Sequence, residues 1–140
     1  MAYCTANKKY NYNDVLYNKT LDCWIQECHK YNCEKNGWKF NPLKKGAYGY
    51  DNLAIVLGNI FTGIINENIC ENIHNSWSEN YIFWRDNKPY ENNNNYIKPY
   101  SPLGDTRRNN LVNLKFAELD DEEKKKDEII RDFILENIKN

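Results

Sequence analysis

The stretch DNLAIVLGNIFTGIINENICENIHNSW, residues 51–77, decides the fold of this chain of 140 residues. Its apolar residues recur every three or four positions, the spacing that places side chains on one face of an α-helix. Gly58 and Gly63 each weaken a helix by about 1 kcal/mol relative to Ala. We therefore expect a break near Gly63 or Asn66, and two helices in place of one. The apolar stripe consists of Leu53, Val56, Leu57, Ile60, Phe61, Ile64, Ile65, Ile69, Ile73 and Trp77.

Capping signals set the ends of two predicted helices. Asp51 or Asn52 can cap the first, because both side chains accept hydrogen bonds from free backbone N–H groups. Near the C-terminus, Asp120 followed by Glu123 is a variant capping box, and the acidic first turn suits the helix dipole. We expect a helix over residues 120–138, with an apolar face made of Ile130, Phe133, Ile134 and Ile138.

The remaining segments suggest a mainly α fold. It consists of a small helical domain over residues 51–140, with a short extended arm or β-hairpin, and a helical N-terminal extension over residues 1–50 that packs on it. Residues 45–50 read as a turn-rich connection, and residues 86–110 as a long polar loop that packs partly against the domain. The extension has a short helix carrying Tyr17, Leu21, Trp24, Ile25 and Cys28, and the arm carries Leu111, Val112, Leu114 and Phe116.

The composition argues for a folded protein that does not bind nucleic-acid polymers. Lys and Arg number 19 against 20 Asp and Glu, a net charge of −1, which is too little positive charge to hold a polyanion. Aromatic residues make up 14% of the chain, whereas disordered chains are poor in them. No apolar run approaches the ~20 residues of a membrane span, and the start lacks the apolar core of a signal peptide. We expect a cytoplasmic protein that does not bind membranes.

Few residues suggest catalysis or metal binding. The chain has two histidines, and it lacks the G-x-S-x-G, H-E-x-x-H and Walker motifs. We expect no enzyme, with an uncharacterised hydrolase as the alternative. Cys23, Cys28, His29 and Cys33 follow the spacing C-x4-C-H-x4-C, but helix positions five apart point about 140° away from each other. We therefore expect no metal site and no cofactor.

Two stretches resemble signatures of the ryanodine-receptor repeat domain, the RyR domain. ENIHNSW, residues 71–77, looks like the family's "E-N-I-H-x-x-W". LKFAELDDEEKKKD, residues 114–127, is similar to its later "L-x-P-Y-x-x-L-x-x-x-E-K-x-x-D". Their order and rough separation agree with the family, and the resemblance covers roughly residues 53–138.

The chain also departs from the family pattern. Phe83-Trp84 stands where the family has Gly-Trp, and Lys115-Phe116 replaces Pro-Tyr. The segment NGWKFNP, residues 36–42, echoes the family's Gly-Trp motif. A decayed partial repeat is therefore an alternative interpretation of residues 1–50.

The resemblance implies a stand-alone module, of the viral, phage or bacterial type, that binds a nucleotide-derived small molecule. The ligand class is an adenine nucleotide, ADP-ribose or a cyclic-nucleotide-like signal, and a viral version would sequester that signal from host defence. Tandem copies of the domain pack together in animal calcium-release channels, so the resemblance also implies a homodimer.

Aromatic and basic residues supply the candidate ligand contacts. His74 and Trp77 lie one turn apart on one side of a helix: Trp77 can stack on a base while His74 donates a hydrogen bond, or Trp77 can fill the core while His74 bonds a loop carbonyl. Trp84 can complete an aromatic clamp, with arginines holding phosphates; the alternative is a solvated loop with aromatic packing. The candidate set is His74, Trp77, Trp84, Arg85, Tyr90, Lys98, Tyr100, Arg107 and Arg108.

Two functions remain open at this point. The first is capture of a nucleotide-derived ligand, which requires a pocket with an aromatic ring and at least two convergent cations. The second is a protein–protein interaction module without a small ligand, which requires a flat apolar patch of several hundred Å².

Overall fold

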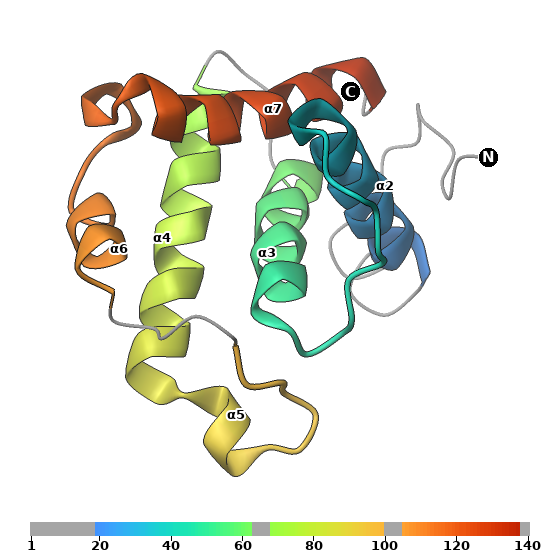
Figure 1. Ribbon diagram of the computed structural model, residues 1–140, viewed down its shortest axis with the longest axis vertical. Helices are drawn as coiled ribbons and strands as arrows, with labels where there is room; N and C mark the ends of the chain where they lie inside the picture. The colour runs from blue at the N-terminus through green and yellow to red at the C-terminus, as the bar shows by residue number, and fades with distance from the viewer. Residues whose placement is uncertain (1–18, 63–67, 100–104, 138–140) are drawn as a thin grey trace.

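The computed structural model describes residues 19–62, 68–99 and 105–137 (Figure 1). These residues are mainly helical, so the predicted fold class is confirmed. They contain no β-strand, and the extended arm or hairpin is therefore not confirmed. The elements are α2 (Lys19–Asn36), α3 (Tyr48–Thr62), α4 (Ile69–Asn87), α5 (Pro89–Asn92), α6 (Thr106–Leu111), the 3-10 helix η1 (Phe116–Glu118) and α7 (Asp121–Asn137).

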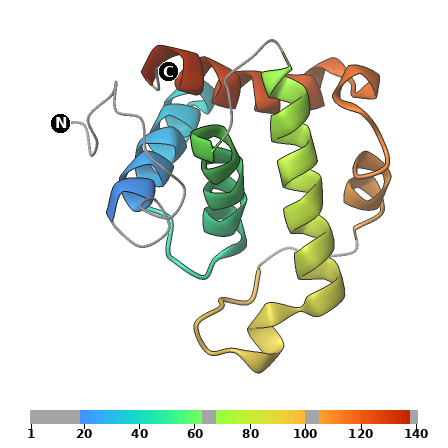
Figure 2. The ribbon, with the colours of Figure 1, turned by 180° about the vertical axis from the view of Figure 1, so that it is seen from behind.

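Four helices form the body of the molecule. α3 and α4 lie side by side, and α7 runs across one end of both (Figure 1). α2 packs against α3 and α7, so the region predicted as an N-terminal extension contributes a helix to the same core. α6 lies on the opposite side of α4 from α3 (Figure 2). No described helix combines the length and the apolar character that a membrane crossing requires.

Aromatic contacts between α2 and α7 form part of the core. The ring of Phe133 meets the ring of Trp24 edge-on, with centroids 6.1 Å apart, and lies 5.7 Å from the ring of Tyr31. The predicted apolar stripe is confirmed in its described part except at Trp77, which is only half-buried. Six of its side chains are buried in this core. They are Leu53, Val56, Leu57, Ile60, Ile69 and Ile73.

The start of α3 differs from the prediction. The helix begins at Tyr48, so the interpretation of Asp51 or Asn52 as its cap is wrong. Asp51 lies in the first turn, where its carboxylate accepts a hydrogen bond of 3.1 Å from Nε1 of Trp84. The earlier start is stabilised by Tyr50, which is buried and donates its hydroxyl hydrogen to Asp22 of α2 at 2.9 Å.

Other helix ends agree with the prediction. α3 ends at Thr62 and α4 begins at Ile69, so the two expected helices are present. Gly63 and Asn66, where we expected the break, lie outside the described residues. At the start of α7, the backbone N–H of Glu123 donates to Asp120 Oδ1 at 2.9 Å, which confirms the cap.

The polar segment after residue 86 is more helical than expected. α4 continues to Asn87, and Lys88 then adopts a left-handed conformation (φ 43°) that separates α4 from α5. Leu111 ends α6, and Phe116 begins η1. The residues expected to form an arm therefore form helix ends and turns that lead into α7.

A contact at Gly46 connects the segment after α5 to the start of α3. The carbonyl of Gly46 accepts a hydrogen bond of 2.9 Å from the N–H of Ile97, and the φ of Gly46, 88°, lies in the left-handed region. A Cβ atom at this position would overlap the main-chain oxygen of Asn95. Only glycine permits both the conformation and the close approach.

We predict that Phe133→Ala lowers the free energy of unfolding by about 3–5 kcal/mol, because it leaves a cavity between α2 and α7. Urea denaturation measures the change. The matched control is Leu135→Ala on the same helix, whose side chain is 53% exposed, and which should change stability by no more than about 0.5 kcal/mol. Similar losses in the two variants would contradict this description of the core.

Candidate functional site

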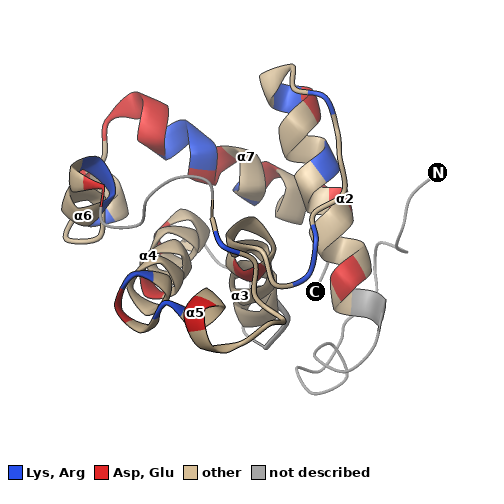
Figure 3. Cartoon of the chain, turned by 60° about the horizontal axis from the view of Figure 1, so that its bottom comes forward, with Lys and Arg blue, Asp and Glu red and all other residues tan. Residues whose placement is uncertain are grey.

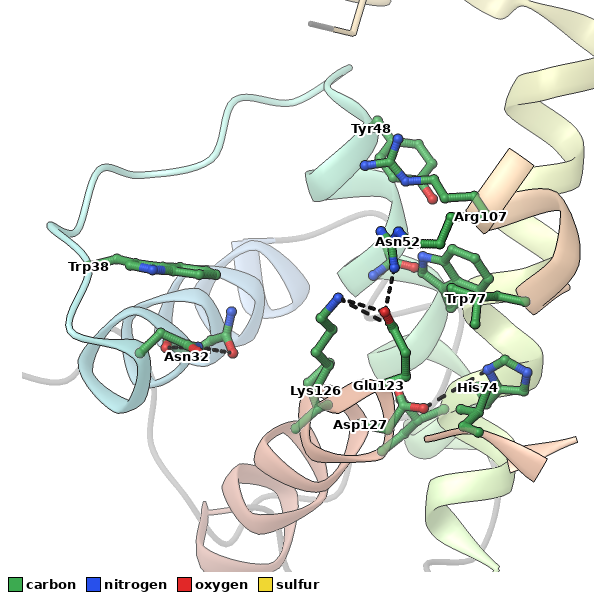
Figure 4. Close-up of a pocket in the computed structure, with 16 residues that line it drawn as sticks. Asn32, Trp38, Tyr48, Asn52, His74, Trp77, Arg107, Glu123, Lys126 and Asp127 are labelled. Atoms are coloured by element: carbon green, nitrogen blue, oxygen red, sulfur yellow. Dashed lines mark hydrogen bonds and ion pairs between the residues drawn. The ribbon is translucent and has the colours of Figure 1, made fainter. Parts of the chain in front are cut away.

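A cavity of about 340 Å³ lies between the ends of α2 and α3, the middle of α4, α6 and the first half of α7 (Figure 4). Of the predicted site residues, it brings together four: His74, Trp77, Arg107 and Arg108. Its volume falls at the lower end of the range of small-molecule sites.

Trp77 forms the aromatic wall of the cavity. Its indole is nearly parallel to the ring of His74, with centroids 6.0 Å apart, and to the ring of Tyr81, at 5.4 Å. At these separations parallel rings are offset and not directly face to face. The stack fixes the orientation of a half-buried ring that faces the cavity.

His74 is engaged by the protein itself. Its side chain is buried, and Nε2 donates a hydrogen bond of 2.7 Å to the carbonyl oxygen of Leu114. Since a carbonyl only accepts, Nε2 must carry the hydrogen. The structure thus shows the second of the two roles considered for this residue, bonding of a loop carbonyl, and leaves Nδ1 facing Asp127 Oδ2 at 4.0 Å.

A second residue of α4 holds the same loop. Oε2 of Glu71 accepts a hydrogen bond of 2.8 Å from the N–H of Phe116. Glu71 and His74 therefore bind the chain at the start of η1 at two points. These bonds join the two stretches, residues 71–77 and 114–127, that carry the resemblance described above.

The charges around the cavity are unevenly paired. Glu123 of α7 forms ion pairs with Arg107 of α6 and, at 3.2 Å, with Lys126. α6 thus lies against the acidic first part of α7 (Figure 3). Arg108 is half-buried and forms no ion pair within the part of the chain that the structure describes. It is the cation best placed to meet a bound anion.

Two polar groups of α3 lack partners in the cavity wall. The side-chain oxygen of Asn52 is buried and accepts no hydrogen bond from the described residues. The hydroxyl of Tyr48 lies next to the Trp77 indole and forms no hydrogen bond of good geometry with the part of the chain that the structure describes. Burial raises the pKa of that hydroxyl, and the charge of Arg108 opposes the rise. Buried polar groups are usually paired, so these two call for an explanation.

Asp127 forms part of the cavity floor. Burial raises the pKa of its carboxyl group to about 7, and the negative charge of Glu123 adds to the rise. The side chain is 14% exposed. Near neutral pH this carboxyl group therefore exists in both protonation states, and it can donate or accept a hydrogen bond.

Trp84, predicted as part of an aromatic clamp, does not line the cavity. It is fully buried, and its Nε1 donates to Asp51. Three tyrosine rings surround its indole with centroids 5.6–6.0 Å away, those of Tyr48, Tyr90 and Tyr96. The predicted ligand residues Trp84 and Tyr90 thus form a packed aromatic cluster. The aromatic packing agrees with the alternative interpretation, but the residues lie in α4 and α5 and not in a solvated loop.

The other predicted contacts also lie elsewhere. Arg85 donates hydrogen bonds of 2.7 Å to Asp86 and to Asn109 of α6, so its guanidinium is occupied. Lys98 is exposed and does not line the cavity. Tyr100 lies outside the described residues.

Several residues of the cavity were not among the predicted contacts. Tyr48 and Asn52 come from a helix whose start was misplaced, and Glu123 was interpreted only as part of a helix cap. Trp38 lies in the NGWKFNP segment, which was noted only for its echo of a family motif. Helical spacing relates Glu123 to Asp127, but only tertiary packing brings α6 to them.

No protein-family model, no curated protein and no solved structure matches this chain.

We predict that the free energy of unfolding falls as pH rises from about 4 to 7. The pKa of Asp127 is about 7 in the folded state and about 3.9 in an unfolded chain, so the folded state binds more protons in this interval. Asp127→Asn removes the contribution of this carboxyl group, and its stability relative to the wild type should increase with pH by on the order of 2–4 kcal/mol.

Urea unfolding at pH 4.5, 6 and 7.5 measures this effect. Asp121→Asn, an exposed change on the same helix, is the control and should retain the wild-type slope. A wild-type slope in Asp127→Asn would show that another group is responsible.

Proposed function

We propose that the chain binds a nucleotide-derived small molecule in the cavity lined by Trp77 and Arg108. The observation that carries the proposal is the presence, in one cavity, of a fixed aromatic ring and a guanidinium that has no ion pair among the described residues. This is the ligand class that the resemblance to RyR domains implies, and membership of that family belongs to the same proposal.

The indole of Trp77 supplies a surface for a base. Stacking of a base on an aromatic side chain contributes about 1–3 kcal/mol and tolerates any base, because every base has a π face. The contacts of Trp77 with His74 and Tyr81 hold its ring in place before a ligand arrives. Less conformational entropy is therefore lost on binding.

The cations supply a site for phosphate. Arg108 can donate two parallel hydrogen bonds to a phosphate group, and the Tyr48 hydroxyl can donate another. Arg107 and Lys126 share the single carboxylate of Glu123, so an anion that enters the cavity meets more positive than negative charge.

Asn52 supplies a contact for the base. Its buried, unpartnered oxygen can accept a hydrogen bond from an exocyclic amino group such as that of adenine. A buried acceptor left unpaired costs about 1–3 kcal/mol, so a ligand that pairs with it recovers that energy.

The roles in a host cell belong to the same proposal. Sequestration of a defence signal, a cytoplasmic location and a homodimer all stay predictions. The alternative function, a protein-interaction module, would use exposed apolar side chains such as Ile82 and Phe83 of α4.

We predict that an adenine-containing nucleotide raises the melting temperature. Thermal-shift measurements with ATP, ADP-ribose, cyclic ADP-ribose and cyclic dinucleotides test this. A ligand at 100 times its dissociation constant stabilises the folded state by about 2.7 kcal/mol. No shift with any of them at millimolar concentration would contradict the proposal and favour the alternative.

Variants of the two central residues test the position of the site. Trp77→Leu and Arg108→Gln should each weaken binding by roughly tenfold or more, because they remove the stacking surface and the free cation. Arg131→Gln is the matched control, since Arg131 lies outside the cavity and pairs with Asp132. Binding that is equally weakened in the control, or unchanged in Arg108→Gln, would place the ligand elsewhere.

A further inference from the structure

Trp38 is the second tryptophan that lines the cavity, and it is far more exposed than the two buried tryptophans of the chain. It is 61% exposed, whereas Trp24 and Trp84 are buried, and it lines the cavity together with Trp77. The backbone fixes its place: Gly37 adopts a left-handed conformation (φ 71°), and the N–H of Trp38 donates to the carbonyl of Cys33 at 2.8 Å. This arrangement is the αL ending of a helix, with a large aromatic residue directly after it.

The two indoles lie at opposite ends of the cavity. Figure 4 shows Trp38 at one end, over Asn32 of α2, and Trp77 at the other, on α4. The side chains of Lys126 and Glu123 lie between them. One face of the Trp38 indole thus rests over the end of α2, and the ring remains largely open to solvent.

We propose that the ligand of this cavity is a dinucleotide: one base packs on Trp77, the second base packs on Trp38, and the phosphate linkage lies beside Lys126 and the arginines of α6. The proposal rests on the proposed function and narrows it from nucleotides in general to molecules with two aromatic rings joined through phosphate.

Three observations favour two rings over one. A mononucleotide stacked on Trp77 leaves the other indole uncovered, because that indole is at the far end of the site. The cationic side chains lie between the rings or beside Trp77, where the linkage of a dinucleotide would pass. Trp38 belongs to the lining of the cavity of about 340 Å³ yet is 61% exposed, so a ring that packs on it does not have to fit inside that volume.

Isothermal titration calorimetry with AMP, the linear dinucleotide pApA and cyclic di-AMP tests the proposal. At least one dinucleotide should bind roughly tenfold or more tightly than AMP, because a second stacked base adds contacts of its own. Trp38→Ala should abolish that advantage and change AMP affinity less than about twofold. Trp38→Phe should restore most of it, since a ring is again present.

Two further variants test whether the loss of dinucleotide preference is specific to Trp38. Trp77→Leu should weaken AMP and the dinucleotides alike, because both use that ring. Phe83→Ala removes another exposed aromatic side chain, outside the cavity, and should leave all affinities unchanged. Because Trp38 is largely exposed, its replacement should preserve the wild-type melting temperature, which controls for folding.

The outcomes distinguish the two proposals. If AMP binds as tightly as the dinucleotides and Trp38→Ala binds all of them normally, the dinucleotide proposal is overturned while the proposed function stands. If no nucleotide binds the wild-type protein, both are overturned. A preference for dinucleotides that persists in Trp38→Ala would also overturn the dinucleotide proposal, since the second base would then lie elsewhere.

Discussion

Two hydrogen bonds from α4 to the chain at the start of η1 determine the geometry of the cavity. His74 holds the carbonyl of Leu114, and Glu71 holds the N–H of Phe116. The held segment joins α6 to α7, so its position sets where the arginines of α6 meet the carboxylates of α7. A buried donor or acceptor left without its partner costs about 1–3 kcal/mol. The loop therefore has one strongly preferred position on α4.

The cavity combines polar groups that do not contribute to stability. Asn52 has an unpaired oxygen, Arg108 has no ion-pair partner in the described residues, and burial raises the pKa of the Asp127 carboxyl to about 7. The buried unpaired oxygen and the buried carboxyl group are unfavourable in a folded protein without a ligand. Groups of this kind cluster at functional sites more often than elsewhere. Their position around one aromatic wall favours this cavity, rather than the exposed apolar residues, as the functional site.

The helices could be predicted from the sequence because local signals agreed with tertiary packing. The described apolar side chains between Leu53 and Ile60, with Ile69 and Ile73, face the core, and the cap at Asp120 starts α7 where expected. The start of α3 was missed because Tyr50 is stabilised by Asp22 of another helix, a contact that no local pattern reveals.

The candidate site could be predicted only in part. Trp77 and the two arginines of α6 share the cavity as expected, while Trp84 does not. Trp84 follows Trp77 by seven positions, two helical turns, but three tyrosines surround it. Trp38 and Asp127 reach the cavity only through the packing of α2 and α7. Spacing along one helix predicts which residues are neighbours on that helix. This site combines residues from five helices, so spacing alone does not predict it.

The contact at Gly46 restricts how this sequence can change over evolutionary time. Any side chain at position 46 would overlap the main-chain oxygen of Asn95, and the same glycine leads into the helix that carries Tyr48 and Asn52. Position 95 has more freedom, because the contact uses the main-chain oxygen of Asn95 and not its side-chain amide. Descendants of this chain that keep the cavity should therefore retain glycine at position 46 while residue 95 drifts.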